Sequence, residues 1–290
     1  MGKKISLKLK IYRTLYPLKI FIKSLTNNME NHHNKGKFNL EGKKAIVFGI
    51  ANDQSIGWHI AQALNDNGVQ IAVAYQKRVE QLVGPLLAML NNPLAQKCDV
   101  TDDGLLDAFF EKVKKEFSRV DFLIHSIAFS KRQHLAGKYY ETDWRGYQVA
   151  HQVSSYSLVE LTRRALPLMN NGGSIITMTY YGSNKVIPNY NVMGVAKAAL
   201  EASVRYLAHD VGEKGIRVNA ISAGPIKTLA SSGITDFDKI LEKVRQQSPL
   251  KRNIKAGDVA DLALFLCSDM SHNITGQVIY VDAGCSITGI

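Results

Sequence analysis

The chain has few of the residues that build disulfide frameworks or metal sites. Only three cysteines occur among its 290 residues, Cys98, Cys267 and Cys285. They are too few and too scattered for a disulfide-bonded scaffold, which indicates a reducing compartment. The eight histidines show no metal-ligand spacing, and the adjacent His32 and His33 lie in a polar stretch without a cysteine. We therefore expect no metal site.

Acidic residues are missing from the first 28 positions. Residues 1–40 carry +8 of the net charge of +11, so the other 250 residues carry +3 and give no strong reason to expect nucleic acid. Lysines interrupt the apolar residues of this tail, which excludes a membrane span and disfavours a secretory signal. We expect residues 1–39 to be a disordered extension or an over-long gene start before Met29. Organelle targeting or membrane-surface binding is the alternative.

Short apolar runs alternate with helical periodicity beyond the tail. This alternation predicts βαβ units in an α/β fold, a single Rossmann-like domain over residues 40–290. Its doubly wound sheet has about seven parallel strands with helices on both faces. Ligands bind such sheets at the carboxyl ends of the strands. The predicted strands are 44–49, 69–75, 94–100, 120–128, 173–180, 216–222 and 277–284, and the main helices are 56–68, 101–117 with Thr101 as N-cap, 143–170 and 190–214.

The ordinary G-x-G-x-x-G fingerprint is absent from the first strand–helix turn, which reads "GIANDQSIG". Such a turn is often only a turn, but its place after the first strand favours pyrophosphate binding at a helix N-terminus. Gly49 allows a tight exit from the strand, and Gly57 allows close helix packing. Ser55 is predicted to donate its hydroxyl to a phosphate, and Ile56 its backbone N–H.

The end of the second strand lacks the acid that usually bonds the ribose 2′-hydroxyl of NAD. The sequence there is "YQKR". Gln76 can bond a ribose hydroxyl, while Lys77 and Arg78 could meet a 2′-phosphate or form a solvated basic turn. The choice between NADH and NADPH stays open at this point.

Two further strand ends supply candidate cofactor contacts. Asp99 could bond the adenine amino group with the Val100 backbone beside it, or it could cap the next helix. Ile127, beyond the fourth strand, is predicted to lie against the adenosine ribose or the nicotinamide.

Tyr190 and Lys197 stand seven residues apart at the start of a predicted helix. Seven residues are nearly two helical turns, so both side chains fall on nearly the same face. A nearby ammonium favours a phenolate, so we expect Lys197 to lower the pKa of Tyr190. The alternative is two unrelated surface residues.

Several motifs together resemble one family. Ordinary short-chain dehydrogenase/reductases carry Tyr-x3-Lys, but here the fourth residue after Tyr190 is Gly194. "YNVMGVAK" instead fits Tyr-x6-Lys, and it is accompanied by "GIANDQSIG", "CDV", "HSIAF", "IPNYNVMG" and "NAISAGPIKTLASSGI". From about residue 38 to about residue 288 the chain resembles enoyl-[acyl-carrier-protein] reductase of type II fatty acid synthesis, a divergent short-chain dehydrogenase/reductase.

The resemblance implies a reaction and roles for site residues. It implies reduction of the C2–C3 double bond of trans-2-enoyl-acyl carrier protein by NADH or NADPH. Tyr190 would bond the enolate oxygen of the thioester, Lys197 the nicotinamide ribose, and Tyr180 would assist or line the acyl pocket. Ser130 and Met193 would contact substrate, and residues 228–247 would form a lid. The implied nicotinamide contacts are Ile226, Lys227, Thr228, Leu229 and Ala230.

The resemblance also implies partners. An acyl carrier protein is acidic, so Lys227, Lys251 and Arg252 are candidates for a basic docking rim. Family members are usually homotetramers, and we expect the helices 143–170 and 190–214 at the interface and the enzyme in a bacterial cytoplasm. Three rival functions are a reductase for a ketone or alcohol, a non-catalytic nucleotide-binding regulator, and a membrane- or RNA-binding protein directed by the basic tail.

Overall fold

Seven parallel strands form a single sheet in the order β3-β2-β1-β4-β5-β6-β7. The computed structural model describes residues 38–170, 172–229, 231 and 237–288. The predicted tail therefore lies almost wholly outside the described residues. All seven predicted strands are confirmed, with several shorter than predicted. They are β1 (Lys44–Phe48), β2 (Gln70–Tyr75), β3 (Leu94–Lys97), β4 (Phe122–His125), β5 (Gly173–Thr179), β6 (Ile216–Ala223) and β7 (Val278–Val281).

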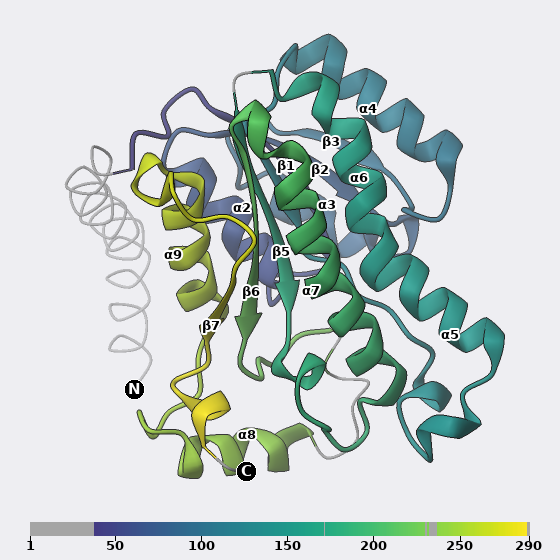
Figure 1. Ribbon diagram of the computed structural model, residues 1–290. Helices are drawn as coiled ribbons and strands as arrows, with labels where there is room; N and C mark the ends of the chain where they lie inside the picture. Colours follow the sequence, from purple (N-terminus) through teal and green to yellow (C-terminus); the bar gives the residue numbers. More distant parts are fainter. Residues whose placement is uncertain (1–37, 171, 230, 232–236, 289–290) are drawn as a thin grey trace, which may run out of the picture. The chain divides into compact units, whose positions relative to one another are not determined.

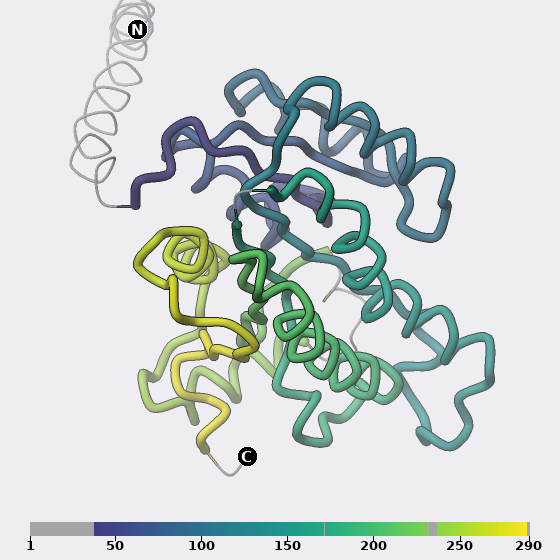
Figure 2. Tube along the Cα trace, turned by 45° about the horizontal axis from the view of Figure 1, so that its top comes forward, coloured from purple at the N-terminus to yellow at the C-terminus, as the bar shows by residue number. Residues whose placement is uncertain are grey.

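Helices cover both faces of this sheet, as predicted (Figures 1 and 2). On one face α2 (Ile56–Asp66) and α9 (Ala256–Cys267) pack against each other. On the other, a continuous apolar core joins the strands to α4 (Asp103–Phe117), α6 (Ser157–Ala165) and α7 (Asn191–Val211). The remaining α-helices of the described residues are α3 (Glu80–Leu87), α5 (Trp144–His151) and α8 (Phe237–Gln247).

Two predicted helix details were wrong. The helix expected over 143–170 is interrupted by a π-helical turn, η4 (Gln152–Tyr156), and ends in a 3-10 turn, η5 (Leu166–Leu168). Thr101 is not the N-cap of α4. Asp102 holds that position, and its side chain accepts a hydrogen bond from the backbone N–H of Leu105. The Thr101 hydroxyl is not available as a cap, because it donates to the Asp99 carboxylate. The same carboxylate also accepts a hydrogen bond from the backbone N–H of Thr101.

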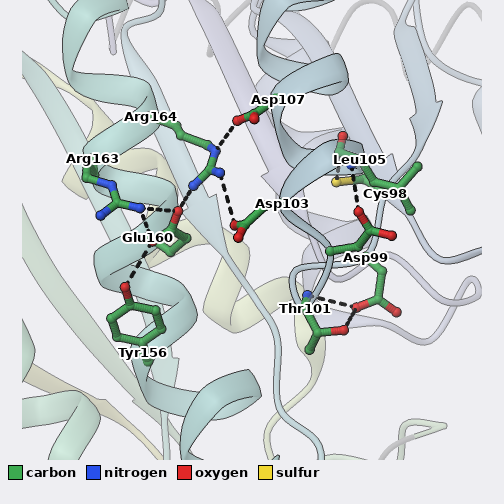
Figure 3. A network of polar contacts seen from close by, with 11 residues as sticks. Cys98, Asp99, Thr101, Asp103, Leu105, Asp107, Tyr156, Glu160, Arg163 and Arg164 are labelled. Carbon is green, nitrogen blue, oxygen red and sulfur yellow. Dashed lines mark hydrogen bonds and ion pairs between the residues drawn. The ribbon is translucent and has the colours of Figure 1, made fainter.

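A charged network fastens α6 to α4 (Figure 3). The Arg164 side chain, 14 % exposed, donates to Asp103 at 3.1 Å and to Asp107 at 3.0 Å. It also pairs with the buried carboxylate of Glu160 on its own helix. Arg163 donates to the same carboxylate at 2.6 Å. The network holds together two of the helices that cover this face of the sheet.

Membrane-spanning helices and metal-binding clusters are both absent from the described part of the chain. Within it, no helix is long and apolar enough to cross a membrane. Nor do three or more His, Cys, Asp or Glu side chains gather there in a metal-holding arrangement. All three cysteines are free and buried, and burial raises the pKa of the Cys98 thiol to about 12.

Candidate active site

The turn after β1 brings the backbone of two strand ends into close contact. Gly49 has φ 99°, and a Cβ there would collide with the carbonyl oxygen of Ser126, which follows β4. Only glycine fits this left-handed, crowded position. Ile56 is the first residue of α2. Its backbone N–H therefore has no partner within the helix and is available to an anion.

The Ser55 hydroxyl is already engaged within this turn. It accepts hydrogen bonds from the backbone N–H groups of Ala51 and Asn52, both at 3.0 Å. It donates to the side-chain oxygen of Asn52 at 3.1 Å. In this arrangement Ser55 orders the loop rather than offering a free donor, so its predicted bond to a phosphate requires a change of hydroxyl partner.

Gln76 and Asp99 join the ends of β2 and β3. Gln76 Nε2 donates to Asp99 Oδ2 at 3.1 Å, and Arg78 Nε donates to Gln76 Oε1 at 2.8 Å. The other Asp99 oxygen is held by Thr101, as described above. The predicted adenosine-side residues thus form one hydrogen-bonded chain. Val100, next to Asp99, packs partly buried against the core.

A pocket of about 510 Å³ lies at the ends of β2 and β3. Lys77, Asp99 and Thr101 contribute to its lining. The exposed Lys77 ammonium is therefore placed to meet an anion there. The Arg78 guanidinium lies instead over the Phe129 ring, 5.6 Å from its centroid. The two basic residues of "YQKR" accordingly have different surroundings.

The segment after β4 is tied to the π-helical turn. Ser154 of that turn accepts a hydrogen bond from the Phe129 backbone N–H at 3.0 Å and donates to the Phe129 carbonyl at 3.3 Å. Ile127 packs partly buried against the main core. Ser130 donates its hydroxyl to the neighbouring carbonyl of Lys131 at 3.3 Å. The π-helical turn therefore positions the loop that carries both predicted contact residues.

Tyr190 contacts Tyr180, which follows β5, and Lys197 contacts Met178 within β5. The Tyr190 ring packs edge-on against the Tyr180 ring, with 5.1 Å between their centroids. Lys197 Nζ donates to the backbone carbonyl of Met178 at 2.6 Å. Tyr180 directly follows β5 and Tyr190 directly precedes α7. Both side chains therefore contact the carboxyl end of β5, and their convergence on one ligand stays a prediction.

Close packing explains why the ordinary Tyr-x3-Lys pair is absent. A Cβ at Gly194 would lie 2.8 Å from the carbonyl oxygen of Gly182. A Cβ at Gly182 would in turn lie 2.7 Å from the ring of Tyr190. The first turn of α7 and the segment after β5 therefore touch through two glycines, and a lysine at 194 has no room.

The expected lowering of the Tyr190 pKa is wrong for this structure. Burial raises the pKa of Tyr190 well above its usual range, with Tyr180 and Glu201 acting in the same direction. Burial likewise raises the pKa of Tyr180. Burial lowers the pKa of Lys197 to about 8, which Glu201 opposes. Both phenols are therefore neutral hydrogen-bond donors near pH 7.

The remaining predicted residues have mixed surroundings. Met193 is buried in a small core cluster with Ala150, Val192 and Ala196, against which Tyr190 packs. After β6, Lys227 forms an ion pair with Asp238 of α8 at 3.0 Å. Thr228 and Ser231 bond each other across a turn, Ile226 is half-buried and Leu229 is exposed. Ala230 lies outside the described residues.

Sequence reasoning missed Glu201. It is buried on α7 and accepts hydrogen bonds from Thr179 and Ser183. The available signal was its spacing, because a carboxylate four residues after Lys197 lies on the same helix face. The site as a whole contains the phenol donors Tyr180 and Tyr190, the buried ammonium of Lys197 and the open backbone N–H at the start of α2. All of them lie at the carboxyl edge of the sheet. The helix N-terminus suits the phosphates of a nucleotide. The phenols and the ammonium suit a neighbouring substrate oxygen that gains negative charge during a reaction.

Comparison with known proteins identifies the family of this chain. Residues 49–286 match the family model described as enoyl-(acyl carrier protein) reductase. The chain is 49% identical over 251 residues to the enoyl-[acyl-carrier-protein] reductase [NADH] FabI of Rickettsia prowazekii, covering 86% of this chain and 96% of the relative. It is 45% identical to the FabI of Bacillus subtilis, covering 87% of this chain and 98% of the relative.

Two solved structures share the fold. One is the Bacillus cereus enoyl-acyl carrier protein reductase with NADP+ and an indole naphthyridinone, with a TM-score of 0.85 and 44% identity, covering 87% of this chain and 99% of that one. The other is the Anaplasma phagocytophilum enzyme in complex with NAD, with a TM-score of 0.83 and 46% identity, covering 87% and 96%. The chain belongs to the enoyl-[acyl-carrier-protein] reductase family.

Proposed function

We propose that the protein reduces the C2–C3 double bond of trans-2-enoyl thioesters carried by acyl carrier protein, with NADH as the reductant. This reaction is the last step of the fatty acid elongation cycle. The observation that carries the proposal is that Tyr190 packs on Tyr180 and Lys197 bonds Met178, both at the carboxyl end of β5, in a chain of this family. The missing Tyr-x3-Lys pair argues against a ketone or alcohol reductase.

The residues at the strand ends fit a dinucleotide. The open N–H of Ile56 at the start of α2 would hold the pyrophosphate. Gln76 and Asp99, already paired at 3.1 Å, would take the adenosine, with Ile127 beside it. Lys197 would hold the nicotinamide ribose, and the segment from Ile226 to Leu229 would bind the nicotinamide. Lys77 beside the pocket would also tolerate a 2′-phosphate, so NADPH is expected to serve less well rather than not at all.

When bound, the nicotinamide supplies a hydride to C3 of the enoyl thioester. Negative charge then develops on the thioester oxygen, and the neutral phenol of Tyr190 donates a hydrogen bond to it. Tyr180 packs against the Tyr190 ring and restricts where that hydroxyl points. The protonated Lys197 adds positive charge at the same edge of the sheet. A proton from solvent then adds at C2, which balances the hydride and completes the saturated acyl thioester.

The acyl group would lie between the loop after β4 and α8. Ser130 would line its path, and we propose residues 228–247, whose described part includes α8, as a lid. Met193 would act as an apolar wall through its packing beneath Tyr190. Lys251 and Arg252 would attract the acidic carrier protein. The Lys227 ammonium, paired with Asp238, would contribute less to this rim than predicted.

We also propose a homotetramer in a bacterial cytoplasm. Trp144 of α5 and Tyr206 of α7 are 73% and 75% exposed, which supports helices 144–165 and 191–211 as the buried faces of an assembly. The three free cysteines support a reducing compartment. Size-exclusion chromatography with light scattering measures the mass, and a monomer would contradict the assembly.

The deciding assay compares substrates and reductants with the purified protein. Crotonyl thioester should be reduced with NADH, and acetoacetyl thioester should be reduced at least about 100-fold more slowly. Faster reduction of acetoacetyl thioester would indicate a ketone reductase. Cofactor binding without turnover of either thioester would indicate a nucleotide-binding regulator.

A further inference from the structure

A buried carboxylate lies beside the Tyr–Lys pair, and none of the roles proposed above uses it. Glu201 follows Lys197 by four residues on α7, so the two side chains lie on one face of that helix. Glu201 is only 6 % exposed. Carboxylates are rarely buried to this extent unless hydrogen bonds and positive charge compensate for the loss of water.

The hydrogen bonds of Glu201 reach the segment that carries Tyr180. Its Oε1 accepts from the Thr179 hydroxyl at 2.7 Å and from the Ser183 hydroxyl at 2.6 Å. Thr179 is the last residue of β5, and Ser183 is the last residue of the 3-10 turn η6 (Tyr181–Ser183). The carboxylate therefore ties both ends of the segment around Tyr180 to the helix that carries Lys197.

The charge of Glu201 opposes the effect of burial on Lys197. The Lys197 ammonium bonds the uncharged carbonyl of Met178, and burial lowers its pKa while Glu201 raises it. His125 of β4 also faces this region, between the hydroxyls of Thr177 and Ser157. Burial and the nearby Lys197 lower the pKa of His125 to about 3, so this imidazole is neutral and brings no competing charge.

The phenols of the site add no negative charge near neutral pH. Burial raises the pKa values of Tyr180, Tyr181 and Tyr190, and Asp282 acts in the same direction on the first two. The Asp282 carboxylate accepts hydrogen bonds from the backbone N–H groups of Gly284 and Ser286. Glu201 is thus the carboxylate that both contacts the Tyr180 segment and acts on Lys197.

We propose that Glu201 is a positioning residue of the reductase site, which holds Tyr180 in place through Thr179 and Ser183 and keeps Lys197 protonated. The inference rests on the roles proposed above for Tyr180 and Lys197. The proposal has two parts that different substitutions test. The charge effect is the action of the Glu201 charge on Lys197, and the hydrogen-bond effect is the positioning of Tyr180 through Thr179 and Ser183.

Glu201→Gln tests the charge effect. The amide oxygen of glutamine can still accept hydrogen bonds from Thr179 and Ser183, but the negative charge is gone. Losing an opposite charge lowers the pKa of a lysine by about one unit. If protonated Lys197 binds the cofactor, affinity for NADH should then fall at a pH about one unit lower than in the wild type. Fluorescence titrations of NADH from pH 6 to pH 9.5 measure this shift.

Asp210→Asn is the matched control for the charge effect. Asp210 is an exposed carboxylate on the same helix, and its loss changes the net charge of the protein by the same amount. Its pH profile for NADH binding should overlay that of the wild type. An equal shift in both variants would mean that Glu201 has no special effect on Lys197, and would overturn the charge effect.

Ser183→Ala tests the hydrogen-bond effect. It removes one of the two short hydrogen bonds to Oε1 and leaves the charge in place. Turnover of the enoyl thioester should fall about threefold to tenfold because Tyr180 is held less firmly, while the pH profile of NADH binding stays unchanged. An unchanged turnover number overturns the positioning role. Circular dichroism confirms folding, and if Glu201→Gln does not fold, Ser183→Ala decides alone.

Lys197→Met separates failure of this inference from failure of the proposed function. If Lys197→Met loses NADH binding while the Glu201→Gln profile overlays the wild type, the proposed function stands and the charge effect of Glu201 is overturned. If Lys197→Met binds NADH like the wild type, the role of Lys197 in the proposed function is wrong, and the charge effect of Glu201 falls with it.

Discussion

At the scale of single residues, burial governs the protonation of the Tyr–Lys pair. Tyr190 and Lys197 are both shifted toward their neutral forms, because a low-dielectric surrounding penalises charge on either group. The phenol is therefore a hydrogen-bond donor throughout the neutral range. The ammonium, with its pKa lowered to about 8, titrates close to working pH.

We expect Tyr190→Phe to lower the turnover number of enoyl thioester reduction by about 100-fold to 1,000-fold, because the thioester oxygen loses a donor when it gains charge. The dissociation constant for NADH should change less than about twofold, since the ring and its packing against Tyr180 remain. Steady-state kinetics and NADH titration measure the two quantities.

Tyr206→Phe, on the same helix, removes a hydroxyl outside the active site but keeps the ring that the proposed assembly would bury, and it serves as the control. Turnover in this variant should match that of the wild type. Equal, small losses in Tyr190→Phe and Lys197→Ala would count heavily against the assignment of the pair.

The pH dependence of NADH binding follows from the lowered pKa of Lys197. The protonated amine is the form that can donate to a ribose hydroxyl and attract phosphate, so affinity should fall as pH rises through about 8. Stability should respond in the opposite direction. The unfolded chain holds the proton up to about pH 10.5, so between pH 8 and that value deprotonation favours the folded state.

Two measurements test this prediction, one of NADH affinity and one of stability. NADH titrations and urea unfolding are carried out at pH 7 and at pH 9.5 on the wild type and on Lys197→Met. The difference in unfolding free energy between the two proteins isolates the contribution of this lysine. A wild-type affinity that stays constant up to pH 9.5 would show that the protonation state of Lys197 does not matter for binding.

At the scale of secondary-structure elements, two glycines set the distance between α7 and the segment after β5. Gly194→Ala should destabilise the protein by about 1–3 kcal/mol, because its Cβ would lie 2.8 Å from the Gly182 carbonyl oxygen. This strain outweighs the helix propensity gained, which is at most about 1 kcal/mol. Turnover should also fall, since Tyr190 begins the same turn. Denaturant unfolding and kinetics measure both effects.

Gly257→Ala is the matched control for this prediction. A Cβ at Gly257, in the first turn of α9, would meet no atom within 4 Å. The same substitution there should leave stability unchanged or raise it by up to about 1 kcal/mol. Opposite signs for the two variants would confirm that close packing makes Gly194 necessary. Equal stabilisation of both would contradict it.

The network between α4 and α6 makes a separate prediction (Figure 3). Arg164→Met should lower the free energy of unfolding by about 2 kcal/mol, because Glu160 is buried and loses one of its two cations. Arg163→Met should cost less than about 1 kcal/mol, because that side chain is 67% exposed. Urea unfolding of both variants measures the difference, and equal losses would contradict the distinction.

The elements were predictable from sequence where one physical signal dominated. Most strands are short apolar runs, and all seven were found, including β3, whose sequence LAQK is half polar. The choice of N-cap for α4 was harder to predict, because several nearby polar side chains can bond one another. Thr101 donates its hydroxyl to Asp99, and Asp102 caps α4 instead. The π-helical turn inside the 143–170 helix has no periodicity signal, because its residues fit an α-helix equally well.

The candidate site was predictable to a similar extent. Motif spacing singled out Tyr190 and Lys197, whose side chains contact Tyr180 and Met178 at the end of β5. The direction of the Tyr190 pKa shift was not predictable from the sequence. It depends on how deeply the phenol is buried and on Glu201, and both follow from tertiary packing. Charge near a residue can be read from a sequence, but desolvation cannot.

At the scale of the whole molecule, charge and fold belong to different parts of the chain. Residues 1–40 carry +8 of the net +11, while every described strand and helix lies between Leu40 and Ile290. The family match likewise covers residues 49–286. These observations favour a catalytic unit that does not depend on the basic tail.

We therefore expect deletion of residues 1–28 to leave turnover of enoyl thioester and the dissociation constant for NADH within about twofold of the full chain. The melting temperature should change by less than about 2 °C, because no core residue named above is removed. Any binding of the full chain to anionic vesicles or RNA should disappear, since the deletion removes the excess positive charge.

The control is a full-length variant in which the lysines of residues 1–28 become glutamine. It removes most of the positive charge of this segment and keeps its length. If activity is lost in the deletion but kept in the glutamine variant, the tail supports the fold through its length rather than its charge, and the assignment of residues 1–39 as dispensable is wrong.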